Sequence, residues 1–321
     1  FAVHDLCEQQ GARTMLKQIL TGSIAAMLLG GANAQAETLR VETIYPAASD
    51  EAAAVRTIAI DRFAGREGSD FANRIEDRLL DAAIDGQPYF TLLHRSQAGN
   101  ADAILGGGAR VRVTETEFSQ QRKICVEEDE DGDCVRREKV DLACVRLAID
   151  VRPRANLRSA EGHILWSERL SRSEVLSYCP GYDDEPLIAP AVDLALAGAA
   201  DDVRRALAPV QAIEDIRIME RRKGMPRDAS KAFRDAIRLT KQDERGACEA
   251  FAALEPAIGA HPSLLFNLGL CAEQVGDFAT AEQYYGQALA DKTSDDEAQA
   301  GLRRIGLYLA AESQLESREP Q

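Results

Sequence analysis

The sequence predicts an α+β fold, in which a mostly antiparallel sheet with two helices is followed by a short all-helical domain of repeated hairpins. Strand-like alternation and turn signals dominate residues 37–208, whereas apolar residues recur at helical spacing from Ala229 onward. Between them lies a charged segment with Gly and Pro, RRKGMPRD at 221–228, which is typical of a linker. We therefore expect domains at 37–219 and 229–315, and 321 residues suffice for two cores.

The first domain is expected to pair two helices with its strands. A helix over 70–84 follows Ser69, a suitable N-cap, and places Phe71, Ile75 and Leu79 on one apolar face. An Ala- and Leu-rich helix is expected over 191–207, and Pro209 ends it. The expected strands cover 39–45, 55–63, 89–94, 103–118, 122–127, 134–140, 144–151 and 163–170.

The second domain is best defined by residues 264–290, LLFNLGLCAEQVGDFATAEQYYGQALA. This segment predicts two helices separated by a turn at Gly276-Asp277, and small residues fall where the helices must approach closely. Ala247, Phe251 and Leu254 precede equivalent positions by 34 residues, and a third helical segment over 295–313 is expected to cap the array. The expected repeat core is Leu265, Leu268, Gly269, Ala281, Tyr285 and Ala288.

The residues of 264–290 and the period of 34 resemble the tetratricopeptide repeat. In that family, stacked helical hairpins form a groove that binds a peptide. The resemblance implies that Phe266, Leu270, Glu273 and Gln274 lie on the concave, partner-binding side. The alternative is that the helix over 229–241 covers Phe266 and Leu270.

The first domain resembles the small α/β domain of CsgG-like curli-secretion proteins and the N-terminal domain of TolB. The resemblance is carried by RTIAIDRF at 56–63, GSDFANRIEDRLL at 68–80, YFTLLHR at 89–95 and ADAILGGGARV at 101–111. It implies a periplasmic protein that binds other envelope components and has no chemistry of its own.

The segment from Met15 to Ala36 reads as a secretory signal peptide. Lys17 provides the positive charge, residues 19–29 form a short apolar run, and Ala34-Gln35-Ala36 supplies the small residues before the cleavage site. Cleavage is expected before Glu37, with cleavage after Ala34 as the alternative, and residues 1–14 form an upstream extension. Because no Cys lies at the cleavage site, we expect an exported, periplasmic protein without a lipid anchor.

Signal removal takes away Cys7 and leaves six cysteines, which in an exported protein indicates disulfides. Two pairs are symmetric about expected turns, and the third pair consists of the cysteines that remain. The expected bridges are Cys125–Cys134, Cys144–Cys179 and Cys248–Cys271. The acidic run 127–133 between the first pair is shorter than an EF-hand loop, so we interpret it as a solvated hairpin tip and not a calcium site.

The net charge of -15 argues against binding to nucleic acid or to an anionic membrane surface. His94, His163 and His261 are scattered, and no spacing indicates a catalytic or metal-binding group, so neither an enzyme, a metal nor a cofactor is expected. We expect a scaffold or adaptor that binds a protein or peptide. The alternatives are a self-associating structural protein whose helices only cap the α/β domain and, with least weight, a hydrolase.

Overall fold

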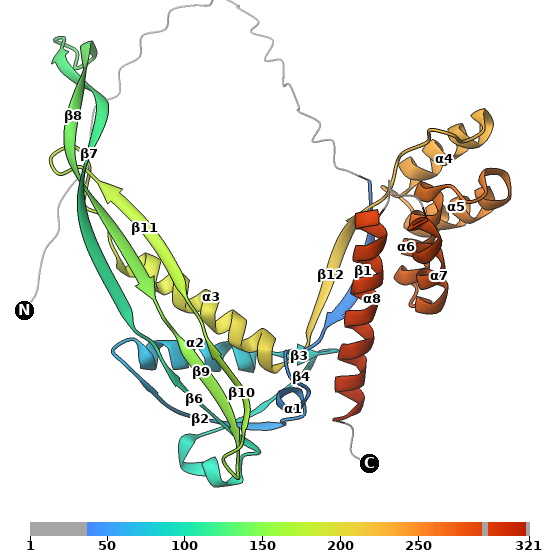
Figure 1. The fold of residues 1–321 in the computed structure, drawn as a ribbon, viewed down its shortest axis with the longest axis horizontal. Coiled ribbons are helices and arrows are strands. Elements are labelled where there is room, and N and C mark those ends of the chain that lie inside the picture. Colours follow the sequence, from blue (N-terminus) through green and yellow to red (C-terminus); the bar gives the residue numbers. More distant parts are fainter. Residues whose placement is uncertain (1–36, 291–294, 319–321) are drawn as a thin grey trace, which may run out of the picture. The chain divides into compact units, whose positions relative to one another are not determined.

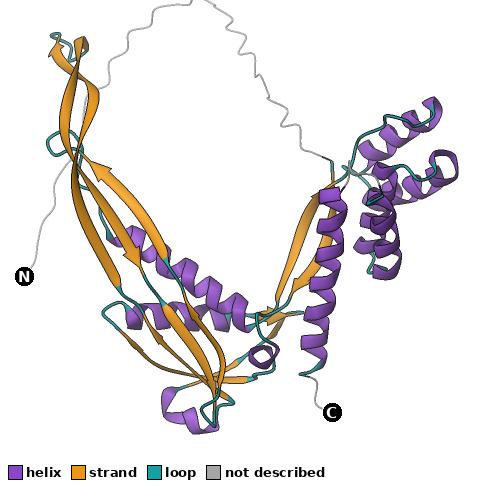
Figure 2. Ribbon diagram, in the orientation of Figure 1, coloured by secondary structure: helices purple, strands orange, loops and turns teal. Residues whose placement is uncertain are grey.

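The computed structural model describes residues 37–290 and 295–318. Strands with a few helices make up its first part and helices alone follow in its second, which confirms the α+β class (Figures 1 and 2). The expected signal peptide at 15–36 lies outside the described residues. Within these ranges, no helix has the length and apolar character needed to cross a bilayer.

A five-stranded sheet in the order β10-β9-β6-β2-β5 organises the first part. β2 pairs in parallel with β5 and β6, whereas β9 pairs antiparallel with β6 and β10. The parallel pairs were not expected; they arise because α2 returns the chain across the sheet after β2. The bounds are β2 (Thr57–Ala64), α2 (Gly68–Leu80), β5 (Thr91–Leu93), β6 (Ala103–Gly108), β9 (Arg154–Ser159) and β10 (Ile164–Arg169).

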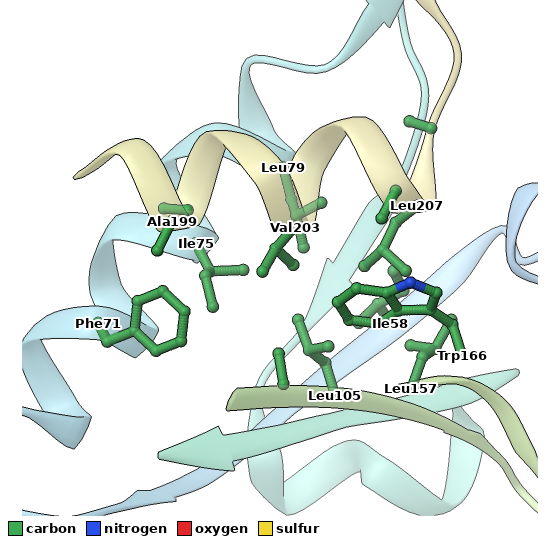
Figure 3. Packing of buried hydrophobic residues seen from close by; sticks show 14 of the residues in the cluster. Ile58, Phe71, Ile75, Leu79, Leu105, Leu157, Trp166, Ala199, Val203 and Leu207 are labelled. Atoms are coloured by element: carbon green, nitrogen blue, oxygen red, sulfur yellow. The ribbon is translucent and has the colours of Figure 1, made fainter. Parts of the chain in front are cut away.

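Helices α2 and α3 (Ala189–Leu207) pack their apolar sides on one face of this sheet (Figure 3). Phe71, Ile75 and Leu79 are fully buried, as their spacing predicts. They meet side chains from the strands, among them Leu105 and Leu157. Burial of this apolar surface is the main force that stabilises the first part.

A three-stranded sheet, β11-β8-β7, continues from this core. β7 (Val111–Glu128) and β8 (Cys134–Val151) form one long hairpin, and β11 (Arg172–Tyr178) pairs with the proximal part of β8. The expected breaks at 119–121 and 141–143 are absent, because the two strands remain in register there. Disulfide Cys125–Cys134 bridges the hairpin near its tip, and Cys144–Cys179 joins β8 to the segment after β11.

The chain enters and leaves the first part through an antiparallel pair, β1 (Thr38–Tyr45) and β12 (Val210–Arg217). Leu39, Val41 and Ile218 belong to the core of the helical part and not to that of the five-stranded sheet. The helices are α4 (Arg227–Leu239), α5 (Glu244–Ile258), α6 (Pro262–Gln274), α7 (Phe278–Ala288) and α8 (Asp295–Glu316). Disulfide Cys248–Cys271 links α5 to α6, so all three expected bridges are present.

The end of α8 contacts the α/β part. The side chain of Gln314 hydrogen-bonds the backbone of Ala47, and Arg318 donates to the carbonyls of Ala53 and Tyr89. The short elements α1 (Asp50–Ala53), β3 (Ala83–Ile84), β4 (Gln87–Pro88) and a 3-10 helix (Arg95–Asn100) lie in the α/β part. The described residues from Glu37 onward form one compact unit, so the two expected domains contact each other.

Candidate functional site

The four residues expected to bind a partner lie mostly inside the protein. Phe266 is 1% exposed, Leu270 is fully buried and Glu273 is 4% exposed, so the expected apolar spot on a free groove is wrong. α5, α7, α8 and β1 all pack on α6, and the Phe266 ring lies 5.6 Å from that of Tyr285, whereas the helix at 229–241 packs mainly on α5. Gln274 is partly buried, and its Nε2 donates to the Arg40 carbonyl at 2.9 Å.

The expected repeat core is buried as its spacing predicts. Tyr285 is fully buried, and its ring lies so close to α6 and α8 that only glycine fits opposite it. A Cβ at Gly269 would lie 2.7 Å from the ring, and one at Gly301 would lie 2.5 Å from it. Gly269 of the repeat motif is therefore required by the close approach of the helix to Tyr285.

The polar side of Tyr285 ends in a buried ion pair that sequence reasoning missed. The Arg304 guanidinium donates to both Glu273 oxygens at 2.6 Å, and the Tyr285 hydroxyl donates to Oε2 at 2.6 Å. Burial alone would lower the pKa of Arg304, but the hydrogen bonds and charge of Glu273 leave that pKa raised. Burial, reinforced by Glu273, likewise raises the pKa of Tyr285.

A cavity of about 540 Å³ opens beside this ion pair. It is bounded by β1 and β12, by the turn between α6 and α7, by α8 and by the turn between β3 and β4. Its lining residues are Glu42, Thr43, Ile44, Asp85, Gln211, Ala212, Ile213, Glu273, Gln274, Gly276, Phe278 and Tyr308.

The cavity has an excess of negative charge. Arg304 neutralises Glu273, but among the residues that the structure describes no Lys or Arg lines the cavity to neutralise Glu42 or Asp85. Within the described ranges the Glu42 carboxylate has no hydrogen bond or ion pair, and Asp85 accepts one bond of 2.7 Å from Gln211. Burial raises the pKa of Tyr308, and the carboxylates of Glu312, Asp85 and Glu42 raise it further.

The aromatic part of the lining favours an organic ligand over water alone. The rings of Phe278 and Tyr308 lie 4.6 Å apart and present an aromatic wall. Together with Glu42 and Asp85, this wall suits a cationic organic group, because carboxylates and aromatic faces both attract cations. Thr43 is 3% exposed, and its buried Oγ1 has no hydrogen-bond partner within the described ranges. Because this oxygen is closed off from solvent, its missing hydrogen bond costs free energy within the fold.

The comparisons with known proteins give only slight likenesses. No family model matches the sequence, and no curated protein matches it. Two solved structures of PelC dodecamers from Paraburkholderia phytofirmans are 12% and 13% identical to this chain, with TM-scores of 0.24 and 0.25. The alignments cover 53% and 51% of this chain and 98% and 97% of the PelC chains.

Disulfides do inform the compartment. Three bridges in one chain are typical of proteins that fold in an oxidising environment outside the cytoplasm.

Proposed function

We propose that this protein is a non-enzymatic adaptor of the periplasm, which binds a basic, extended segment of an envelope protein at the acidic cavity. The observation that supports this proposal is the uncompensated pair of carboxylates, Glu42 and Asp85, beside the aromatic wall of Phe278 and Tyr308. Because a lysine or arginine side chain carries both a charge and an apolar stem, it matches this lining.

The free edge of β1 favours an extended ligand. The Arg40 amide donates to Glu244, and the Arg40 carbonyl accepts from Gln274, so these groups point away from β12. Backbone groups alternate in direction along an antiparallel strand, and the pairing of β1 with β12 has no register shift. The amides and carbonyls of Glu42 and Ile44 therefore point the same way, and a partner strand could add there.

A specific observation keeps the structural alternative open as a second proposal. β1 and α8 fill the side of α6 that an open repeat array would present, and α8 also binds the α/β part through Gln314 and Arg318. If the helices only cap the α/β part, the cavity binds no segment and the protein acts through self-association.

The test is peptide binding by calorimetry. The probes are an eight-residue peptide of alternating valine and lysine and its counterpart with glutamate. The variant Glu42→Gln with Asp85→Asn should weaken binding of the lysine peptide about tenfold, the effect of losing about 1.4 kcal/mol.

The matched control is Glu249→Gln with Glu282→Gln, which removes the same charge from exposed positions outside the cavity. It should bind the lysine peptide like the parent protein. Equal binding of both peptides, or an unaffected cavity variant, would refute the proposal. Mass spectrometry of periplasmic material tests the location, since the first residue should be Glu37 or Gln35.

A further inference from the structure

Helices α2 and α3 cover one face of the five-stranded sheet, and the opposite face is rich in arginine. On β9, Arg154, Asn156 and Arg158 point to this second face, because the alternate residues Ala155 and Leu157 are buried in the core. Two adjoining cavities of about 610 and 390 Å³ lie on it and share Arg154 and Arg169. Together they are lined by six arginines, Arg62, Arg110, Arg152, Arg154, Arg158 and Arg169, which we call the arginine face.

The charge of the arginine face is not balanced within the chain. None of the six guanidinium groups forms an ion pair with any residue in 37–290 or 295–318. Two acids line the same cavities: Glu168 and Asp61, and Asp61 is paired with Arg95 at 2.8 Å. This local excess of positive charge stands in a chain whose net charge is -15.

The register of the sheet also places two of these arginines next to each other. Arg154 and Arg169 occupy directly opposite positions on β9 and β10. Like charges at opposite positions repel and destabilise a sheet, so an anion bound between them would remove an unfavourable interaction. Gly106 lies beside Asn156 on this face and has open space where a side chain would stand, so an incoming segment can approach the sheet closely.

The sequence itself holds a segment of matching charge. The tip of the β7–β8 hairpin carries six carboxylates in the seven residues 127–133, and no other window of seven residues holds as many. Its residues are exposed, and of these carboxylates only Glu127 forms an ion pair within the described ranges, with Arg136 at 3.0 Å. Disulfide Cys125–Cys134 closes the base of the tip and limits the conformational entropy that binding would cost.

We propose that the arginine face of one copy of this protein binds the acidic hairpin tip of a second copy. Arginine suits carboxylates because its planar fork can donate two parallel hydrogen bonds to one of them. The contact joins different surfaces of the two copies, so each bound copy still has a free tip or a free face. Association therefore extends beyond dimers, and it weakens as salt screens the charges.

The experiment is sedimentation velocity of the oxidised protein at 20 and 500 mM salt. We expect assemblies at low salt that dissociate at high salt. The patch variant, Arg154→Glu with Arg169→Glu, and the tip variant, Glu128→Lys with Asp131→Lys, should each raise the apparent dissociation constant at least tenfold. The control Arg221→Glu with Arg227→Glu makes the same charge change at exposed positions outside the face and should associate like the parent.

Mixing the two variants gives the decisive result. The patch variant keeps the parent's acidic tip and the tip variant keeps the parent's arginine face, and each of these unchanged surfaces occurs once, so a complex of one to one should form. A monomeric parent protein at 20 mM salt, an unaffected patch variant, or a failure of the mixture to associate would each overturn the proposal. If the charge reversal at the face prevents folding, Arg154→Gln with Arg169→Gln serves in its place, and unchanged association would then overturn the proposal. Neither outcome depends on the acidic cavity, whose peptide binding is measured separately.

Discussion

The acidic cavity and the arginine face differ in construction as well as in sign. The cavity has an aromatic wall and lies against a buried ion pair and an unpaired hydroxyl. The arginine face lies on a sheet and is lined by six arginines that form no ion pair within the described ranges. An aromatic wall selects a side chain by contact, whereas a cluster of unpaired charges acts through long-range attraction that depends on salt. The two surfaces therefore suit different partners and different assays.

The two hydrophobic cores of the protein also differ, in the kinds of side chain that they bury. The core under the sheet is built from apolar side chains such as Phe71, Leu105 and Trp166. The core of the helical part encloses Glu273 and Arg304 among its apolar residues. A buried ion pair contributes little net stability while it is complete, but loss of one partner leaves an uncompensated charge in the interior.

The largest effect should come from breaking that pair. Arg304→Met leaves Glu273 buried without its cation, and we expect the free energy of unfolding to fall by about 3–5 kcal/mol. Urea denaturation followed by circular dichroism measures this loss. Glu273→Gln added to Arg304→Met removes the unpaired charge and should recover part of the stability. A single variant as stable as the parent would show that Glu273 becomes protonated or hydrated in the interior.

The disulfides should rank by the loops they close. Cys144–Cys179 spans 35 residues and Cys125–Cys134 spans 9. Loop-closure entropy gives about 4 kcal/mol for the former and about 3 kcal/mol for the latter. Replacing both members of each pair by alanine tests the order. The two variants should differ in free energy of unfolding by more than these two estimates differ, because Cys144 and Cys179 are also buried, at 1% and 0% exposure. If the variant without Cys125–Cys134 is less stable than the variant without Cys144–Cys179, the predicted order is contradicted.

The sequence predicted what depends on local pattern. The stripe Phe71, Ile75 and Leu79 and the repeat core around Tyr285 both follow helical spacing, and both are buried. Two disulfide pairs followed from symmetry about turns, and Cys144–Cys179 was the pair that remained. Symmetry brings the two halves of a hairpin together, but the observed register places Cys125 opposite Arg137 and Cys134 opposite Glu128.

The candidate site was not predictable from the same patterns, because it depends on distant segments. Glu42, Asp85 and Tyr308 come from three elements that only the tertiary fold brings together. Phe266 and Leu270 were assigned to a groove from the geometry of longer arrays, whereas here β1 supplies Leu39 and Val41 to their core. One signal was available: Glu273 is the one charged residue of α6, and a buried carboxylate requires a cation or donors.

Removing the unpaired hydroxyl of Thr43 should change the free energy of unfolding by a smaller amount, and in the stabilising direction. Thr43→Val keeps the shape and removes the unsatisfied group, so we expect stabilisation by about 1 kcal/mol in thermal or urea unfolding. Thr57→Val is the matched comparison, because the Thr57 hydroxyl accepts from the Asp102 amide at 2.8 Å and its loss should destabilise. Stability losses in both variants would mean that water satisfies Thr43.

The smallest expected effect is the alkaline titration of Tyr45, which lies behind the acidic cavity on β1. Burial and the acceptor Glu214 raise the pKa of Tyr45 to about 12, above the value of about 10 of an unfolded chain. The folded protein thus holds this proton more tightly than the unfolded chain does. The resulting stability is present in full below pH 10 and is lost as the pH rises from about 10 to about 12. Because the side chain is partly exposed, solvent screening keeps the contribution modest.

Tyr45→Phe should therefore lose less stability than the parent between pH 9 and pH 11 in urea titrations, while the exposed control Tyr182→Phe follows the parent. Parallel curves for all three proteins would show that Glu214 does not hold the Tyr45 proton in solution.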